Sequence, residues 1–495
     1  MSGAIKRDKL FYGSCMALIT TAIAFAVTGD IAFELRQEFN LTNAQIGVFA
    51  GVFLWGFTLS QVIFSPLCDT IGMRPIVQGA FVCHVAGALV MMFAGGFTML
   101  VVGALVCGMG AGLVEAGCNP LVAALFPNDK TVKMNTFHMW FPFGILIGAL
   151  ILAWVLSPLG IGWQGKLLLI IVPALIYGAM MLTETYPATE GVSAGVSFSE
   201  MLKACVAPLM LVMLVMMAFT ASLELGPGRW VPAVLASGGI SGILVLGFVN
   251  GIMGTLRMTS KPVVEKLTPT GVLLMSSILA TLGLFMLSYA ESTFMAFATA
   301  AVWAVGIAYF WPTMLGFVSE RIPKSGALGL GMMGAVGMAA SGIATVWMGG
   351  VADNIGHQQL PEQETVAVFE QVVDTFPGIA ANAGDIAVDI RAAVDVSQQV
   401  LTEYGAAGEL PPVITAEALR TIISSGADSP AVDTAGGILN PADNFGGRTS
   451  FRYVAPFGLV LILVFGVLYI KDRRSGGYKQ VKLTTEPTPE DAVAS

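Results

Sequence analysis

Long apolar segments joined by mostly short polar connections dominate the chain. A helix that crosses the hydrocarbon core of a membrane needs about 20 largely apolar residues, and twelve segments approach or exceed that length. They lie at about 11–34, 43–65, 75–96, 98–126, 132–157, 164–184, 203–225, 237–258, 270–289, 292–318, 326–350 and 451–470. This pattern predicts an all-α membrane protein with twelve transmembrane helices.

Two longer connections divide these segments. The polar stretch 185–202 has six apolar segments on each side, and the stretch 351–450 separates the last two. We therefore predict two six-helix bundles joined by a linker. The expected parts are an N-terminal bundle (1–184), a cytoplasmic linker (185–202), helices 7–11 of a C-terminal bundle (203–350), an extracytoplasmic insertion (351–450), helix 12 (451–472) and a cytoplasmic tail (473–495).

The composition supports a membrane location and argues against a soluble enzyme. Hydrophobic residues make up 55% of the chain and charged residues 11%, whereas soluble proteins carry about 25% charged residues. No Gly-rich phosphate loop followed by Lys-Ser/Thr occurs, which argues against an ATP-driven pump. No Cys/His cluster has metal-ligand spacing. We expect no metal and no cofactor other than a coupling ion, either a proton or sodium.

Basic residues indicate the orientation, because cytoplasmic loops are enriched in Lys and Arg. With the N-terminus in the cytoplasm, seventeen of the 24 basic residues fall inside, and Arg257 is counted among them. The segment 351–450 then lies outside, with fourteen acidic residues against three Arg and no Lys. We expect a multi-pass protein of the cell (inner) membrane with both termini cytoplasmic. Its expected partners are lipid and a small-molecule substrate, with no nucleic acid, and it should be a monomer.

Two loops indicate an internal repeat. Pro66 and Asp69 follow the second apolar segment, and Pro262 and Glu265 follow the eighth, 196 residues later in both cases. Two halves with the same orientation imply a pseudo-twofold axis along the membrane normal. The sequence therefore predicts two pseudo-symmetric bundles.

The loop from Asp69 to Arg74 resembles the motif Gly-x-x-x-Asp-Arg-x-Gly-x-Arg-Arg of the major facilitator superfamily. Ser65, Thr70 and Pro75 depart from it. The resemblance implies the major facilitator fold. It also implies that Asp69, Gly72, Arg74 and the repeat counterpart Glu265 form a conformational motif, in which the acid holds a helix end and an Arg across the interface between the halves.

Other segments resemble the fucose–proton symporter family. They include Glu115-Ala116-Gly117-Cys118-Asn119-Pro120, which is similar to the fourth-helix Glu-Thr-x-Ala-Asn-Pro motif. The remaining matches are 30–47, 135–144, 224–230 and 310–313. The resemblance implies a sugar symporter in which two carboxylates of the first half, here Asp30 and Glu115, serve proton coupling and sugar recognition. Arg229, Trp311 and the insertion 351–450 depart from that family.

Three acids, Asp30, Glu115 and Glu224, lie in apolar surroundings. A charge at the centre of a bilayer costs about 2.5–3.5 kcal/mol, so such groups face the bundle interior and pair or take up a proton. We expect Asp30 and Glu115 to couple protons, and Glu115 and Glu224 to bind substrate. The structural alternatives are a packing hydrogen bond for Glu115, a solvated turn for Asp30 and an ion pair with Arg229 for Glu224. The segment Gly226-Pro227-Gly228 is expected to break its helix.

Neutral groups complete the predicted site. Asn119, Asn135 and His138 can hydrogen-bond hydroxyls, and Trp230 and Trp311 can stack on a sugar ring. The alternative for the polar three is contact between helices, worth about 0.6 kcal/mol each. The alternative role for Trp230 and Trp311 is packing between helices.

The insertion 351–450 shows helical patterns at about 362–375 and 385–403, and a weaker one near 416–424. We favour a decoration with no transport role over a cap on the outer mouth. The tail 475–495 is expected to be disordered.

These features predict a secondary active transporter. It would move a small polar solute, a sugar by resemblance, by alternating access as a proton symporter. A proton-driven exporter and a sodium-coupled carrier on the same fold remain open. So does a transporter-like receptor with 351–450 as its sensor, against which the short cytoplasmic segments argue. We do not expect an enzyme.

Overall fold

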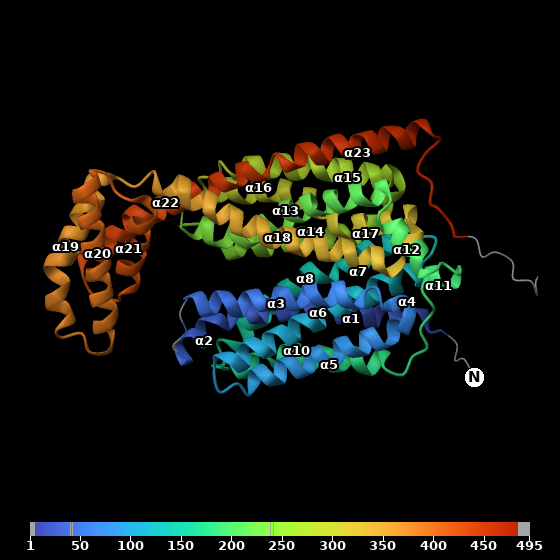
Figure 1. The fold of residues 1–495 in the computed structure, drawn as a ribbon, viewed down its shortest axis with the longest axis horizontal. Coiled ribbons are helices and arrows are strands. Elements are labelled where there is room, and N and C mark those ends of the chain that lie inside the picture. The colour runs from blue at the N-terminus through green and yellow to red at the C-terminus, as the bar shows by residue number, and fades with distance from the viewer. Residues whose placement is uncertain (1–4, 40, 42, 238, 241, 484–495) are drawn as a thin grey trace, which may run out of the picture.

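The computed structural model describes residues 5–39, 41, 43–237, 239–240 and 242–483. Within these ranges every element of regular secondary structure is a helix. Ten apolar stretches are long enough to cross a membrane, and two shorter apolar helices lie at Gly51–Phe64 and Leu244–Met258. Together they make the twelve predicted spans, so the all-α twelve-helix prediction is confirmed for the described residues. The two bundles lie side by side, and further helices project from one end (Figure 1).

The N-terminal half contains the first six spans. Its helices are α1 (Arg7–Asp30), α2 (Ala32–Glu38), α3 (Asn43–Phe64), α4 (Cys68–Ile71), α5 (Met73–Met92), α6 (Phe97–Leu125), α7 (Lys130–His138), α8 (Trp140–Ile151), a π-helical turn (Leu152–Leu156), α9 (Trp163–Lys166) and α10 (Leu168–Met181). The fifth span is α7 with α8 and the π-helical turn, and the sixth is α9 with α10. The short helices α11 (Glu190–Ser193) and α12 (Phe198–Cys205) form the link to the second half.

The C-terminal half contains the other six spans. Its helices are α13 (Pro208–Ser237), α14 (Gly242–Met258), α15 (Ser260–Leu287), α16 (Thr293–Ile307), α17 (Phe310–Arg321), the 3₁₀ turn Pro323–Ser325, α18 (Gly326–His357), α22 (Pro430–Val454) and α23 (Phe457–Arg474). The beginning of α1 and the end of α23 lie at the same end of the molecule (Figure 1). We call this the terminal end and the opposite one the insertion end.

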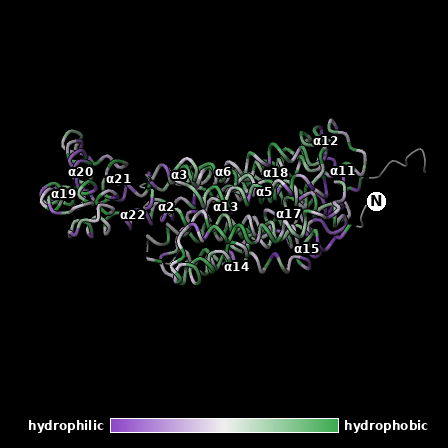
Figure 2. Tube along the Cα trace, turned by 90° about the horizontal axis from the view of Figure 1, so that it is seen from below, coloured by the Kyte–Doolittle hydropathy of each residue, from purple (hydrophilic) through white to green (hydrophobic). Residues whose placement is uncertain are grey.

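Hydrophobic positions dominate the helices of both halves, while α19 (Glu362–Ala380), α20 (Ala387–Ala407) and α21 (Pro412–Ser424) carry more hydrophilic ones (Figure 2). These three helices form the insertion around a small core that includes Phe369, Phe376 and Leu419. The helix α22 joins the insertion to the bundle and runs antiparallel to α18, with Gly356 against Ala442 and Gly446 against Ala352.

The helix α13 continues through Gly226-Pro227-Gly228 to Ser237, so the prediction of a break there was wrong. Pro227 has no backbone N–H and cannot bond the Leu223 carbonyl one turn earlier. The indole of Trp303 donates to that carbonyl at 3.1 Å instead. A neighbouring helix thus satisfies the group that the proline leaves without a donor.

The structure supports the internal repeat. Gly72 ends the turn after α4 with φ 84° and ψ 160°, and Thr268 has φ 64° and ψ 160° at the corresponding place 196 residues later. Thr268 is the only non-Gly residue with positive φ in the described chain. The turn between the eighth and ninth spans therefore lies at Thr268, and the first part of α15 continues the eighth span toward the terminal end.

The first part of the tail packs on the bundle. Tyr478 donates a hydrogen bond to Glu320 at 2.7 Å, and the Val481 N–H donates to the Glu320 carbonyl at 2.8 Å. The expectation of disorder was therefore wrong for residues 475–483. The rest of the tail, 484–495, lies outside the described residues.

Candidate functional site

The two halves close on each other at the terminal end. The helix α7 lies against α17, where Thr131 donates from its backbone N–H (2.9 Å) and its hydroxyl (2.8 Å) to Glu320. The helix α3 lies against α18 at Gly331, where an added Cβ would come within 2.0 Å of the Ser65 hydroxyl oxygen. Small residues thus allow close approach of helices from opposite halves.

Asp69 spans this closure. Its carboxylate accepts hydrogen bonds from the Thr189 hydroxyl and, at 3.3 Å, from the Ala327 backbone N–H at the start of α18. It therefore holds a helix N-terminus of the other half, where an anion is favoured. Burial raises the pKa of Asp69 above its ordinary value, and the two hydrogen bonds oppose that shift.

The other residues of the predicted conformational motif lie elsewhere. Gly72 forms the positive-φ turn. Arg74 donates to the Leu182 carbonyl at 2.7 Å within its own half. Glu265 is exposed and pairs with Lys261 at 3.8 Å. In this conformation the contact between the halves is made by Asp69 and not by Arg74 or Glu265.

A chain of polar groups crosses the centre of the protein from one half to the other. In the first half, the Asn119 amide donates to Glu115 at 2.6 Å, and its oxygen faces His138 Nε2 at 3.0 Å. In the second half, Arg257 donates to the Glu224 carboxylate at 3.1 Å. Arg257 also donates to the His138 carbonyl at 3.0 Å, which joins the two halves. We call these five residues the central network.

Local structure places these groups. Glu115 and Asn119 are four residues apart on α6 and therefore share one face of the helix. His138 ends α7, and its carbonyl lies near the junction with α8. Because the Asn119 amide donates to Glu115, its oxygen must accept from His138, which assigns the proton to Nε2. All five side chains are at least nine-tenths buried.

The position of Arg257 corrects two expectations. Arg257 was counted among the cytoplasmic basic residues, but its side chain is 2% exposed and also donates to the Ala308 carbonyl. Glu224 pairs with Arg257, so the alternative of an ion pair with Arg229 was wrong. The reason is the length of the eighth span, which continues past Arg257 to the turn at Thr268.

Comparison with known proteins identifies the family. The family model described as Major Facilitator Superfamily matches residues 10–356. The chain belongs to the Major Facilitator Superfamily. It is therefore a transporter and not an enzyme.

Individual relatives of this transporter are distant. The chain is 26% identical over 113 residues to the hexose transporter HXT13 of Saccharomyces cerevisiae, a match that covers 22% of the chain and only 20% of the relative. It is 22% identical over 365 residues to a putative tartrate transporter of Agrobacterium vitis, covering 66% of the chain and 80% of the relative. The structure of the E. coli fucose:proton symporter matches with a TM-score of 0.58 at 16% identity, covering 70% of this chain and 92% of that one. This last likeness shows the fold alone.

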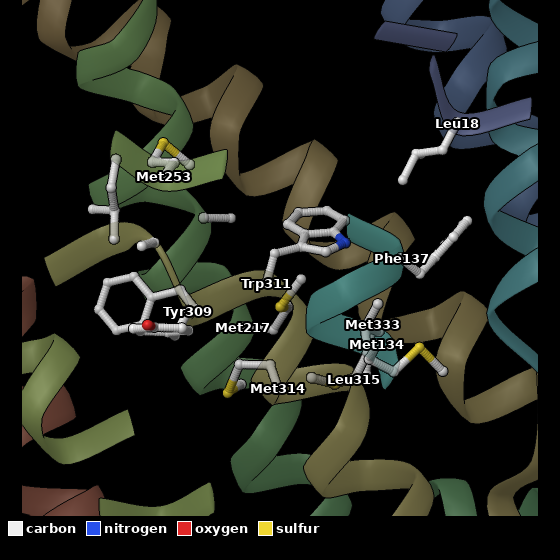
Figure 3. Close-up of a cluster of buried hydrophobic side chains, with 14 of the residues drawn as sticks. Leu18, Met134, Phe137, Met217, Met253, Tyr309, Trp311, Met314, Leu315 and Met333 are labelled. Atoms are coloured by element: carbon white, nitrogen blue, oxygen red, sulfur yellow. The ribbon is translucent and has the colours of Figure 1, made fainter. Parts of the chain in front are cut away.

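Two predicted site residues lie beside the central network of the transporter. Trp311 is 7% exposed, and its indole lies next to Glu115. Figure 3 shows this indole pointing toward Leu18 and Phe137 of the N-terminal half. Asn135 donates to the Thr313 hydroxyl at 3.2 Å across the halves, while its own amide oxygen has no partner among the described residues.

Asp30 and Trp230 lie apart from the network. Asp30 ends α1 and pairs with Lys166 at 2.7 Å, and Lys166 also contacts Glu34. The predicted role of Asp30 in proton coupling stays a prediction. Trp230 donates to the Thr345 carbonyl of α18 at 2.9 Å, a contact that fixes α13 against α18.

One group of side chains at the insertion end has metal-ligand character. Asp353 and His357 of α18 and Asp443 of α22 lie close enough to share an ion. Arg420 of α21 lies 2.8 Å from Asp443 and 3.5 Å from Asp353, on the same oxygens that would bind a metal. This arrangement fits an ionic attachment of the insertion to the bundle.

Proposed function

We propose that this transporter is a proton symporter for a small hydroxylated solute, and that Glu115 carries the proton. The observation that supports the proposal most is the central network, which places two carboxylates and one cation in the buried interface between the halves. The named activity of the fucose:proton symporter with the same fold agrees with it.

Charge balance in the network favours Glu115 as the proton carrier. Glu224 contacts the only cation of the network, Arg257, at 3.1 Å. Glu115 accepts from the Asn119 amide and lies 3.9 Å from His138. With both acids ionised and His138 neutral, the network carries one net negative charge, and an uncompensated buried charge costs several kcal/mol. One proton on Glu115 makes the network neutral.

The network also gives a route from protonation to movement. A proton on Oε2 of Glu115 converts the oxygen that accepts from the Asn119 amide into a donor, so this hydrogen bond must rearrange. Asn119 in turn holds His138, whose carbonyl accepts from Arg257 of the other half. Protonation therefore acts on a contact between the halves, which is the contact that alternating access must break and remake.

Polar atoms near the network are available to the solute. One carboxylate oxygen of Glu224 and the amide oxygen of Asn135 have no hydrogen-bond partner among the described residues. Buried acceptors without donors are costly, and solute hydroxyls would satisfy them. The indole of Trp311 supplies an apolar face beside them.

We propose further that the terminal end faces the cytoplasm of the cell that holds this transporter in its inner membrane. Lys6 and Lys9 lie at the start of α1, Arg74 at the start of α5, Lys203 on α12 and Lys261 at the start of α15, all toward that end, as the rule of positive cytoplasmic loops requires. The closed terminal end then makes this an outward-facing conformation. Each chain contains both halves, so a monomer suffices.

Proteoliposomes test the coupling. Uptake of labelled L-fucose, D-galactose and L-tartrate is measured with and without an inward proton gradient, in the wild type, Glu115→Gln and Asp30→Asn. We expect the gradient to drive accumulation in the wild type. Glu115→Gln should retain exchange but lose accumulation, while Asp30→Asn should accumulate solute.

Uptake that ignores the proton gradient contradicts the proposal, and a response to a sodium gradient in its place identifies a sodium-coupled carrier. Efflux driven by the proton gradient identifies an exporter. Full accumulation by Glu115→Gln removes Glu115 from the mechanism, and loss of accumulation by Asp30→Asn alone assigns the proton to Asp30.

A further inference from the structure

Arg229 is a cation without a carboxylate partner among the residues that the structure describes. It lies on α13, within an apolar stretch that is long and hydrophobic enough to cross the membrane. Its side chain is exposed, and no carboxylate among the described residues pairs with it. Its guanidinium lies 5.8 Å from the centre of the Phe25 ring. Because Phe25 belongs to α1 of the other half, Arg229 faces the space between the halves and not lipid.

Three other basic side chains on the membrane-spanning helices have acidic partners. Lys166 pairs with Asp30 and Glu34, and Arg321 pairs with Asp472. Arg257 pairs with Glu224 and two carbonyls. A charge in a membrane helix is expensive unless it is paired or in water. Arg229 has no such pair among the described residues, so its charge depends on water in this conformation and needs another partner when that water is excluded.

Among the described residues, the wall opposite Arg229 offers a cation–π contact from Phe25 but no carboxylate. Phe25 contacts Phe53, Phe57 and Phe141 at ring distances of 4.8, 6.1 and 5.6 Å. A cation–π contact contributes about 0.5–2 kcal/mol, which is less than a charged hydrogen-bonding partner would give, because phenyl rings carry no net charge. When the halves close over the solute at the insertion end, the guanidinium loses its water against this wall, and desolvation of an unpaired cation is strongly unfavourable.

Arg229 is fixed at a useful distance from the central network. The adjacent Trp230 is anchored on α18 through its hydrogen bond to Thr345, which sets the rotation of α13. Arg229 follows Glu224 by five residues, and a helix rises about 1.5 Å per residue. The two side chains are thus separated by roughly 7.5 Å along the helix, which is the scale of a small polyhydroxylated molecule.

We propose that the solute carries a carboxylate, that Arg229 binds this carboxylate, and that the solute hydroxyls reach the central network. The substrate class is then a hydroxy acid or sugar acid, and not a neutral sugar. This proposal rests on the proposed function, because it takes the space between the halves as the solute site. An Arg guanidinium binds a carboxylate through two parallel hydrogen bonds, which adds geometric specificity to the charge.

The net charge that crosses the membrane follows from these two sites. Arg229 binds the carboxylate of the solute and Glu115 binds one proton. For a solute with a single negative charge, the solute and the proton together carry no net charge across the membrane. Uptake of such a solute responds to a pH gradient and not to a membrane potential.

Binding to matched pairs of probes tests the proposal. Each pair has similar hydroxyls and differs in carboxylate: D-galacturonate with D-galactose, D-glucuronate with D-glucose, and L-tartrate with L-threitol. Affinities are measured by calorimetry on the full-length protein in detergent, for the wild type, Arg229→Gln and Arg229→Lys. Arg391→Gln is the control, because Arg391 is an exposed basic residue on α20 of the insertion.

We expect an acid from at least one pair to bind the wild type and Arg391→Gln at least about tenfold more tightly than its neutral partner. Arg229→Gln should lose that preference, and Arg229→Lys should retain part of it. Equal binding of acid and neutral partner, unchanged acid binding in Arg229→Gln, or no binding of any acid overturns the proposal.

Failure of the proposed function gives a different result. If acids bind through Arg229 but uptake ignores the proton gradient, the coupling proposal fails and the carboxylate proposal stands. If uptake of a neutral sugar follows the proton gradient and Arg229→Gln does not change it, the coupling proposal stands and the carboxylate proposal fails.

Discussion

Removal of the Arg257 side chain gives the sharpest test of the central network. The substitution Arg257→Met keeps a long side chain and deletes the cation. It leaves Glu224 without its partner at 3.1 Å, and the carbonyls of His138 and Ala308 without a donor. Breaking a buried ion pair from one side costs about 3–5 kcal/mol, and each orphaned carbonyl adds about 1 kcal/mol. We expect a loss of unfolding free energy of at least about 3 kcal/mol.

The double variant separates the ion pair from general packing. In Arg257→Met/Glu224→Gln the orphaned carboxylate is gone, so the double variant should be more stable than the sum of the two single losses predicts, by about 2 kcal/mol. Unfolding free energies are measured by steric trapping in detergent micelles. The control is Arg74→Met, because Arg74 is exposed and makes one hydrogen bond. It should lose less than about 1.5 kcal/mol.

Additive effects of the two single substitutions would refute this reasoning, because they would show that Glu224 and Arg257 do not depend on each other. A loss in Arg257→Met no larger than in Arg74→Met would also refute it. In that case Arg257 is not buried in the network.

Three further predictions concern other parts of the chain. Thr268→Gly should raise the unfolding free energy by about 1–2 kcal/mol, because φ 64° with ψ 160° is a conformation that suits glycine. An unchanged unfolding free energy would show that the backbone at Thr268 is not strained. Acidification should favour closure of the terminal end, because the raised pKa of Asp69 means that the closed state binds the proton more tightly. This stabilisation of the closed state is complete below the ordinary pKa of an Asp side chain and is lost as the pH rises through the raised pKa of Asp69. Distances between spin labels at Thr70 and Lys324 should follow it, and less steeply in Asp69→Asn. Replacement of residues 360–439 by a short Gly/Ser loop should leave proteoliposome uptake within about twofold of wild type, because α18 and α22 meet as an antiparallel pair at Gly356; lost uptake would give the insertion a role in transport.

The twelve spans could be predicted from the sequence, because an uninterrupted run of about 20 apolar residues is typical of a membrane-spanning helix. The end of the eighth span was missed because Lys261, Glu265 and Lys266 resemble a loop. The repeat held the missing information, since Gly72 and Thr268 are 196 residues apart and both form the turn. The unbroken α13 could not be predicted, because the indole that satisfies Leu223 comes from Trp303, far away in sequence.

The candidate site was predicted in part, because polar groups within apolar helices can be recognised from the sequence. Glu115, Asn119, His138 and Glu224 stand out as polar groups in apolar helices, and the structure brings them together. Arg257 was missed because its burial depends on where its span ends. The pairing of Asp30 with Lys166 was missed because the two residues are 136 apart along the chain. Partners of this kind follow from helix packing and not from local pattern.

In the proposed mechanism, solute and proton cross together, with the proton on Glu115. Proteoliposomes loaded with a pH-sensitive dye measure it directly when solute is added outside without any imposed gradient. We expect the lumen to acidify on addition of a transported solute in the wild type, and Glu115→Gln to exchange the same solute with no change in lumenal pH. Acidification that persists in Glu115→Gln, or wild-type uptake without acidification, would contradict it.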